Sequence, residues 1–154
     1  RRVLFRSIDR LIIIEKMLEC KKGLLPMDYK FYCFHGKCSW IRVSENRFDS
    51  MEAYAYFDTA WNSIKINDPG QYEMETVPSK PDNLGEMLSL AEKLAEKFDA
   101  VRIDLFNCDG QIYFGEISHY DASGMAKFDP ESLDFEIGAL WKITQDYWER
   151  DSAN

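Results

Sequence analysis

The chain has 154 residues, of which 45% are hydrophobic and 14% aromatic, and these values indicate a globular unit with its own core rather than a disordered segment. Its formal net charge of −8 argues against a general nucleic-acid binder, because such a protein needs a basic surface. The longest β-branched run, residues 11–14, is too short to cross a bilayer, so we do not expect a transmembrane protein.

The cysteines and the chain ends give further expectations. The four cysteines, Cys20, Cys33, Cys38 and Cys108, have no spacing typical of a zinc site, and a reduced cytoplasmic protein is the expected setting. Residues 1–10 carry no capping or turn signal, and we interpret them as a non-native or linker segment. Residues 11–148 are then expected to form one subdomain, and residues 149–154 a frayed tail.

In chain order, the first expected elements are strands. The β-branched run at residues 11–14 is typical of a buried strand. The aromatic run at residues 28–34 and the run at residues 39–43 predict a hairpin around a turn at residues 35–37. Residues 51–57 predict a further strand. The first part of the chain therefore indicates an antiparallel sheet.

A long connection and a helix are expected next. Residues 67–81 contain three prolines and one glycine and indicate a connection without regular structure. From residue 84 to residue 98, apolar side chains recur at helical spacing. Asn83, followed by Glu86 three positions later, is typical of a capping box at the start of this helix.

The last expected elements are a second hairpin and a second helix. Residues 101–106 and 111–117 predict two strands that meet around a glycine-containing turn. Asp129 and Pro130 precede an amphipathic pattern at residues 133–148, which predicts a helix. Strands followed by helices in this order indicate an α+β fold with a mainly antiparallel sheet packed with helices.

The second hairpin is the main candidate for chemistry, because Asp104 and Glu116 stand in otherwise apolar strands, where an unpaired carboxylate is costly to bury. Two registers are possible. A two-residue turn at residues 109–110 would put Asp104 opposite Gly115 and Glu116 on the other face. A three-residue turn at residues 108–110 would put both acids on one face.

We predict the three-residue turn, because it gives Gly110 the left-handed position and separates polar from apolar side chains. Arg102 would then lie opposite Glu116, and Asp104 opposite Phe114. The polar face would carry Arg102, Asp104, Glu116 and Ser118. The core face would carry Val101, Ile103, Leu105, Tyr113 and Ile117.

The polar face permits two interpretations. Two carboxylates beside an arginine suit Mg²⁺ together with phosphate oxygens. The residue types are also compatible with a structural interpretation: a cross-strand ion pair between Arg102 and Glu116, with Asp104 exposed to solvent. Residue types alone leave both open.

Three segments resemble the ATP-grasp superfamily. The pattern Arg102-x-Asp104 followed by Glu116-x-Ser118 is similar to its metal-binding signature. The apolar run that leads into Glu15, Lys16, Met17 and Leu18 resembles its adenine-binding hinge. Residues 28–37, Asp-Tyr-Lys-Phe-Tyr-Cys-Phe-His-Gly-Lys, resemble the TupA-like branch, named for teichuronopeptide biosynthesis. The resemblance covers about residues 11–143 and identifies the expected fold as an ATP-grasp C-terminal subdomain.

The resemblance implies a ligase that uses ATP and Mg²⁺ to join a carboxylate to an amine through an acylphosphate, in cytoplasmic synthesis of a cell-surface polysaccharide. The implied metal ligands are Asp104, Glu116 and Ser118, and the implied catalytic residue near the transferred phosphate is Arg102. The implied nucleotide contacts are Glu15, Lys16, Met17, Leu18 and Asp28. The implied contacts with the substrate are Lys30 and Arg47.

The sequence also departs from the pattern. Ser118 stands where many relatives carry asparagine, and an acidic stretch at residues 49–52 stands where the branch is basic. Nothing before residue 11 resembles the first ATP-grasp subdomain, so we expect a C-terminal fragment that needs a missing N-terminal subdomain and is inactive alone. A catalytically inactive binding or scaffold domain of the same fold is the alternative.

Overall fold

The computed structural model describes residues 11–12, 14–21, 25–45, 53–66, 72–120, 124–125 and 128–143, and the structural statements below concern this part of the chain. In chain order, the elements are β1 (Met27–Phe34), β2 (Lys37–Glu45), β3 (Ala53–Asp58), β4 (Ser63–Ile64), β5 (Tyr72–Glu73), α1 (Leu84–Ala95), β6 (Ala100–Cys108), β7 (Gln111–Ser118) and α2 (Ser132–Leu140). The predicted α+β fold is confirmed.

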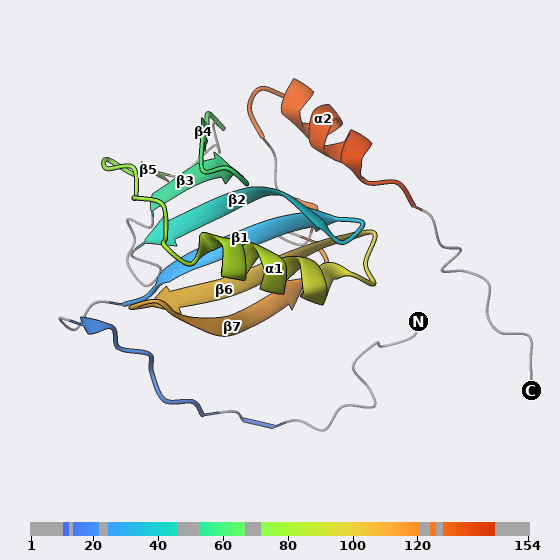
Figure 1. Ribbon diagram of the computed structural model, residues 1–154. Helices are drawn as coiled ribbons and strands as arrows, with labels where there is room; N and C mark the ends of the chain where they lie inside the picture. The colour runs from blue at the N-terminus through green and yellow to red at the C-terminus, as the bar shows by residue number, and fades with distance from the viewer. Residues whose placement is uncertain are drawn as a thin grey trace, which may run out of the picture.

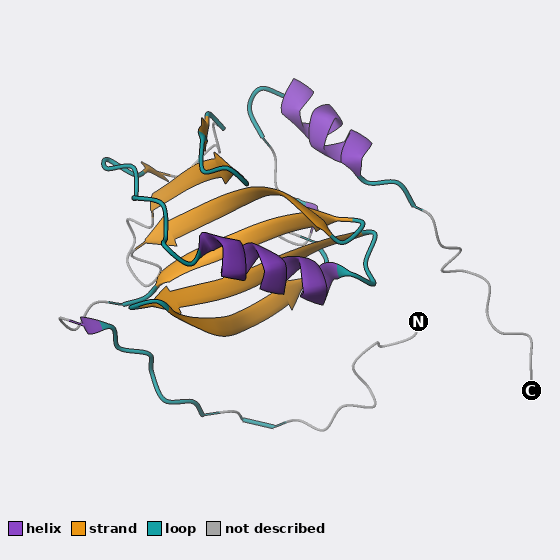
Figure 2. Cartoon of the chain, viewed as in Figure 1, coloured by secondary structure: helices purple, strands orange, loops and turns teal. Residues whose placement is uncertain are grey.

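The strands form one sheet in the order β4-β3-β2-β1-β6-β7 (Figures 1 and 2). Every strand pair in this order is antiparallel, as predicted, and the short β5 adds a parallel pair with β3. Although β6 follows β1 by more than sixty residues, it pairs with β1 along its whole length. The two hairpins that the sequence predicts therefore lie side by side in the sheet, with β7 at its edge.

One face of the sheet is covered by α1, which lies across the strands in Figure 1. The helix buries four apolar side chains at helical spacing, and they are Leu84, Met87, Ala91 and Ala95. They share a cluster with strand side chains that are 0% exposed, including Phe31, Ile41, Ile103 and Leu105. Complete burial of one large apolar side chain stabilises the folded state by roughly 1.5–3 kcal/mol. Because several such side chains are buried between α1 and the sheet, this face holds the main core.

The opposite face is divided into an aromatic part and a charged part. In the aromatic part, Tyr32 and Trp40 stack with ring centroids 3.8 Å apart, and Tyr56 and Phe128 pack against Trp40. The helix α2 contributes only partly buried side chains to this cluster. Strand alternation puts the charged side chains of β1 and β6 on this same face, beside the aromatic cluster.

Several local predictions need correction. The described residues of the predicted strand, Leu11, Ile12 and Ile14, have no regular structure. Ile12 and Ile14 are each 91% exposed, because no strand in the described part of the chain pairs with them. The connection at residues 67–81 contains the short strand β5. The helix α2 ends at Leu140, and residues 144–148 lie outside the described residues, as do residues 1–10 and 149–154.

Asn83 does not cap α1 with its side chain, so the predicted capping box is wrong. Its Oδ1 instead accepts a hydrogen bond from Asn107 Nδ2 at 2.7 Å, and its Nδ2 donates to the carbonyl of Gly110 at 2.9 Å. The side chain therefore fastens the start of α1 to the turn between β6 and β7.

We expect Asn83→Ala to lower the free energy of unfolding by about 1–2 kcal/mol, because two hydrogen bonds between elements are lost. Urea denaturation followed by circular dichroism measures the change. Asp82→Ala is the matched control, because Asp82 is an exposed neighbour. Equal midpoints for the two variants would show that the Asn83 side chain does not hold the turn.

Candidate functional site

The turn between β6 and β7 has two residues, not the predicted three. Cys108 pairs with Gln111, and Asp109 and Gly110 have φ angles of 55° and 87°. Two consecutive left-handed residues are typical of a type I′ turn, and aspartate tolerates this conformation better than most residues with a side chain. The prediction assigned a left-handed conformation to glycine alone and so lengthened the turn by one residue.

A β-bulge at Gly115 restores the shared face that this shorter turn would otherwise remove. Leu105 lies opposite Phe114, whereas the next residue of β6, Asp104, lies opposite Glu116. Gly115 is thus an extra residue on β7, and it reverses the alternation of the strand at this point. The two acids are direct cross-strand neighbours on one face, which is closer than the predicted register would put them.

The new register changes two other predicted pairs and the predicted face of Tyr113. Arg102 lies opposite Ser118 rather than Glu116, and Asp104 does not lie opposite Phe114. Tyr113 pairs with Phe106, so it lies on the polar side of the hairpin instead of the core face. Val101, Ile103 and Leu105 are buried under α1, as predicted. Ile117 pairs with Ile103 but is 37% exposed, so the prediction of a core position is wrong for Ile117.

Arg102 joins the two acids. Its Nε and Nη2 donate to the two oxygens of Asp104 at 2.7 and 2.8 Å. The same Nη2 lies 2.8 Å from Glu116 Oε1 and 3.0 Å from Ser118 Oγ, and Ser118 also donates to Glu116 at 2.8 Å. The structure therefore brings together all four residues of the predicted polar face.

Lys30 extends this network to the neighbouring strand. Its Nζ contacts Asp28 and lies 3.1 Å from Asp104 Oδ2. Lys30, Asp28 and Asp104 are all buried, and Asp104 is only 1% exposed. The structural interpretation is therefore right about an ion pair between Arg102 and Glu116, at 2.8 Å, and wrong about an exposed Asp104.

The sequence interpretation missed Arg42. In the register of the sheet, Lys30 lies between Asp104 on β6 and Arg42 on β2, so these three side chains share one face. Arg42 is partly exposed, and its guanidinium carbon lies 4.9 Å from the centre of the Tyr54 ring. The alternation of Trp40, Arg42 and Ser44 could have revealed it, since it predicts one face for all three.

The donor set fits a magnesium ion bound with phosphates. Mg²⁺ prefers hard oxygen ligands, and in nucleotide sites it takes one or two carboxylates with phosphate oxygens and waters. Asp104 and Glu116 supply adjacent carboxylates, Ser118 supplies a hydroxyl, and Glu116 is exposed enough to be reached from solvent. Arg102 and Arg42 add guanidinium groups, which match phosphate and carboxylate geometry.

The other predicted contacts are not gathered around these acids. Glu15, Lys16 and Met17 are exposed and Leu18 is half-buried, in a segment that has no regular structure. This segment reaches the sheet at its end, where Cys20 forms a disulfide with Cys108. The expectation that all cysteines are reduced is therefore wrong for this pair. Arg47 lies outside the described residues.

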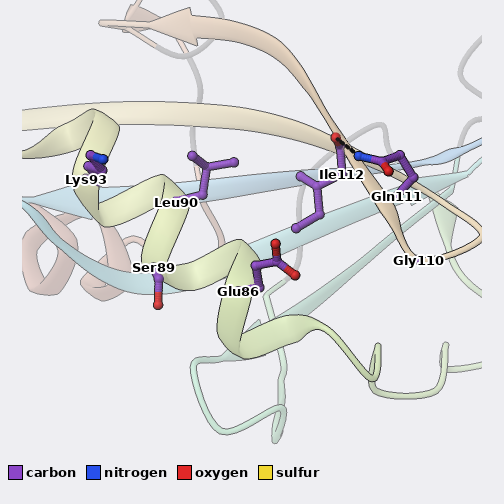
Figure 3. A pocket seen from close by; sticks show the side chains of 7 residues that line it. All are labelled: Glu86, Ser89, Leu90, Lys93, Gly110, Gln111 and Ile112. Atoms are coloured by element: carbon purple, nitrogen blue, oxygen red, sulfur yellow. Dashed lines mark hydrogen bonds between the residues drawn. The ribbon is translucent and has the colours of Figure 1, made fainter.

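A groove of about 560 Å³ lies on the α1 side of the sheet, opposite the charged face (Figure 3). Its lining comes from α1 and from the start of β7, and consists of Glu86, Ser89, Leu90, Lys93, Gly110, Gln111 and Ile112. None of the predicted site residues lines it. The groove is therefore separate from the carboxylate site.

Comparison with known proteins gives one match. A family model described as TupA-like ATPgrasp matches residues 2–142. No curated protein and no solved structure matches the chain. In the described residues, neither helix has the length and apolar character that a membrane crossing requires.

Proposed function

The chain belongs to the TupA-like ATP-grasp family, and from this premise we propose that it is the Mg²⁺-ATP-binding C-terminal subdomain of a carboxylate–amine ligase. In the proposed reaction, a substrate carboxylate attacks the terminal phosphate of ATP and ADP leaves. An amine then attacks the resulting acylphosphate and releases phosphate, which forms a peptide-like bond. The proposed setting is cytoplasmic synthesis of a cell-surface polysaccharide of the teichuronopeptide type.

The observation that carries this proposal is the direct pairing of Asp104 with Glu116 across the bulged hairpin. We assign Mg²⁺ to these two carboxylates with Ser118 as a weaker ligand. When bound, the ion neutralises charge on the ATP phosphates. Arg102 is assigned to the transferred phosphate, because its guanidinium already lies between the two acids.

The remaining roles follow the position of each residue relative to these acids. Lys30 orients Asp104 through its ion pair, and it stands closer to the metal site than a purely substrate-binding residue would. Arg42, partly exposed beside it, is the better candidate for the substrate carboxylate, together with Arg47. Glu15, Lys16, Met17, Leu18 and Asp28 are proposed to bind the nucleoside, and a second subdomain is proposed to enclose the phosphates.

A scaffold domain without catalysis is the alternative, and one observation favours it. Both oxygens of Asp104 are already hydrogen bonded to Arg102, and Lys30 adds a further bond. Such a closed network can be purely structural. The two functions differ in whether ATP binds more tightly when Mg²⁺ is present.

Calorimetric titration of the full-length natural protein with ATP, with and without Mg²⁺, distinguishes them. We expect Glu116→Gln to weaken Mg²⁺-dependent ATP binding by roughly tenfold, since one metal carboxylate is lost. Glu75→Gln is the matched control, because it removes an equally negative and exposed side chain away from the site. ATP binding that is absent, or indifferent to Mg²⁺, would favour the scaffold.

A further inference from the structure

The segment that contains Glu15, Lys16, Met17 and Leu18 is bonded near its end to the hairpin of β6 and β7. Cys20 forms a disulfide with Cys108, across 88 residues of sequence, with their Cα atoms 5.2 Å apart. The backbone N–H of Lys21 donates to Asp109 Oδ2 at 2.7 Å. Before this point, the described residues of the segment are mostly exposed, and Met17 is 58% exposed. In addition to the backbone that continues into β1, the disulfide therefore ties this segment covalently to the end of β6.

The disulfide lies on the same hairpin, β6 and β7, that carries Asp104 and Glu116. Cys108 ends β6, and strand alternation puts its side chain on the same face as Asp104 and Arg102. Cys108 lies four positions after Asp104 along β6, which corresponds to roughly 13 Å. A nucleotide has its base and its terminal phosphate at opposite ends, so one anchor can set the distance between a base-binding segment and a phosphate-binding face.

We propose that Cys20 and Cys108 form a reversible redox modification site whose disulfide holds the nucleotide-binding segment in place, and that a dithiol reductant releases it. This inference rests on the proposed function, because it assigns the nucleoside to this segment. A disulfide in a cytoplasmic protein is usually transient and redox-sensing, since the compartment keeps thiols reduced. Oxidation then favours Mg²⁺-ATP binding and reduction weakens it.

The chemistry is an ordinary thiol–disulfide exchange. A thiolate of the dithiol attacks the sulfur of Cys20, the more exposed of the two, and Cys108 leaves as a thiolate that takes up a proton. The second thiol of the reductant then attacks the mixed disulfide and releases Cys20. Two protons and two electrons pass to the protein, and the dithiol becomes an internal disulfide.

The other two cysteines provide an internal control. A hydrogen bond with Cys33 and burial raise the pKa of Cys38 far above its ordinary value. Because the thiolate is the reactive form, Cys38 stays unreactive at neutral pH. Cys33 is 1% exposed and pairs with Cys38 across β1 and β2, so the Cys38→Ser variant separates a response of these two cysteines from that of the Cys20–Cys108 pair.

The experiment compares the full-length protein before and after treatment with a dithiol. Mass spectrometry of the Cys20 and Cys108 peptides reports the bond, and limited trypsin cleavage after Lys16 and Lys21 reports release of the segment. Calorimetry reports Mg²⁺-ATP affinity. We expect reduction to speed cleavage and to weaken Mg²⁺-ATP binding about tenfold. Cys20→Ser should bind weakly whether or not dithiol is present, and Cys38→Ser should respond as the unchanged protein does.

Each other outcome overturns the proposal in a recognisable way. Free thiols at Cys20 and Cys108 under oxidising conditions, or equal affinity in both redox states, would reject the redox site while Mg²⁺-ATP binding, and with it the proposed function, stands. Tighter Mg²⁺-ATP binding after reduction would reject the proposal that the disulfide favours nucleotide binding. If neither state binds Mg²⁺-ATP, the proposed function fails first, and the cleavage assay still tells whether the bond holds the segment.

Discussion

Replacing Asp104 with asparagine is expected to lower ATP turnover by on the order of 100-fold or more, because the change removes a buried charge where phosphate charge must be neutralised. The carboxylate accepts from Arg102 through both oxygens and from Lys30 through one. An asparagine side chain would direct its amide hydrogens at these donors. Turnover of the full-length protein is measured as ADP release at saturating ATP.

The same substitution is expected to destabilise the fold by about 3–5 kcal/mol, because it leaves buried cations without their partner. Activity must therefore be compared at a temperature where circular dichroism shows a folded protein. Asp99→Asn is the matched control, since Asp99 is also a buried aspartate, just before β6, and it lies 3.7 Å from His35. Turnover that falls equally in both variants would assign the loss to stability and not to a metal site.

The strands of the two hairpins could be predicted because the sequence signal for each of them is local. The aromatic run of β1, the returning β2 and the hairpin of β6 and β7 each combine strand-forming residues with a turn signal. The apolar spacing of α1 is equally clear, and the helix buries the residues that this spacing indicates. These features together were sufficient for the fold class.

The predictions that were wrong depend on interactions with residues far along the chain, which a local sequence pattern does not contain. The apolar run at residues 11–14 signals burial, but the described chain supplies no strand to pair with it. Asn83 has the sequence of a helix cap, yet a turn far along the chain uses both ends of its amide. The bond between Cys20 and Cys108 joins residues too distant for any spacing rule.

The candidate site contains one feature that the sequence pattern predicts and one that it does not. The shared face of Asp104 and Glu116 was predicted and is confirmed, although from a turn one residue too long. Two deviations produce the result, a shorter turn and a bulge, and their effects on alternation cancel. A periodic pattern records which side chains share a face, but it does not record how the backbone achieves it. The use of these acids as metal ligands stays a prediction.

Replacing Gly115 with alanine is expected to dismantle this face without touching either acid. A Cβ at this position would lie 2.9 Å from the backbone carbonyl oxygen of Asp104 and 3.2 Å from the Phe106 ring. Neither the carbonyl nor the packed strand can yield easily, so we expect a loss of about 1–3 kcal/mol in the free energy of unfolding. Urea denaturation measures this loss.

A larger effect is expected on Mg²⁺-ATP binding. If the bulge is lost, Asp104 pairs with residue 115, Glu116 turns to the α1 side, and affinity falls by roughly 10- to 100-fold, as for lost support of a metal ligand. Cross-strand nuclear Overhauser effects distinguish a 104–116 pair from a 104–115 pair.

Gly85→Ala is the matched control, because a Cβ there meets no atom within 4 Å. A Gly115→Ala protein that keeps the 104–116 pair and its Mg²⁺-ATP affinity would show that the bulge does not depend on glycine. If the variant changes register and keeps its full Mg²⁺-ATP affinity, the metal site does not depend on the pairing of Asp104 with Glu116.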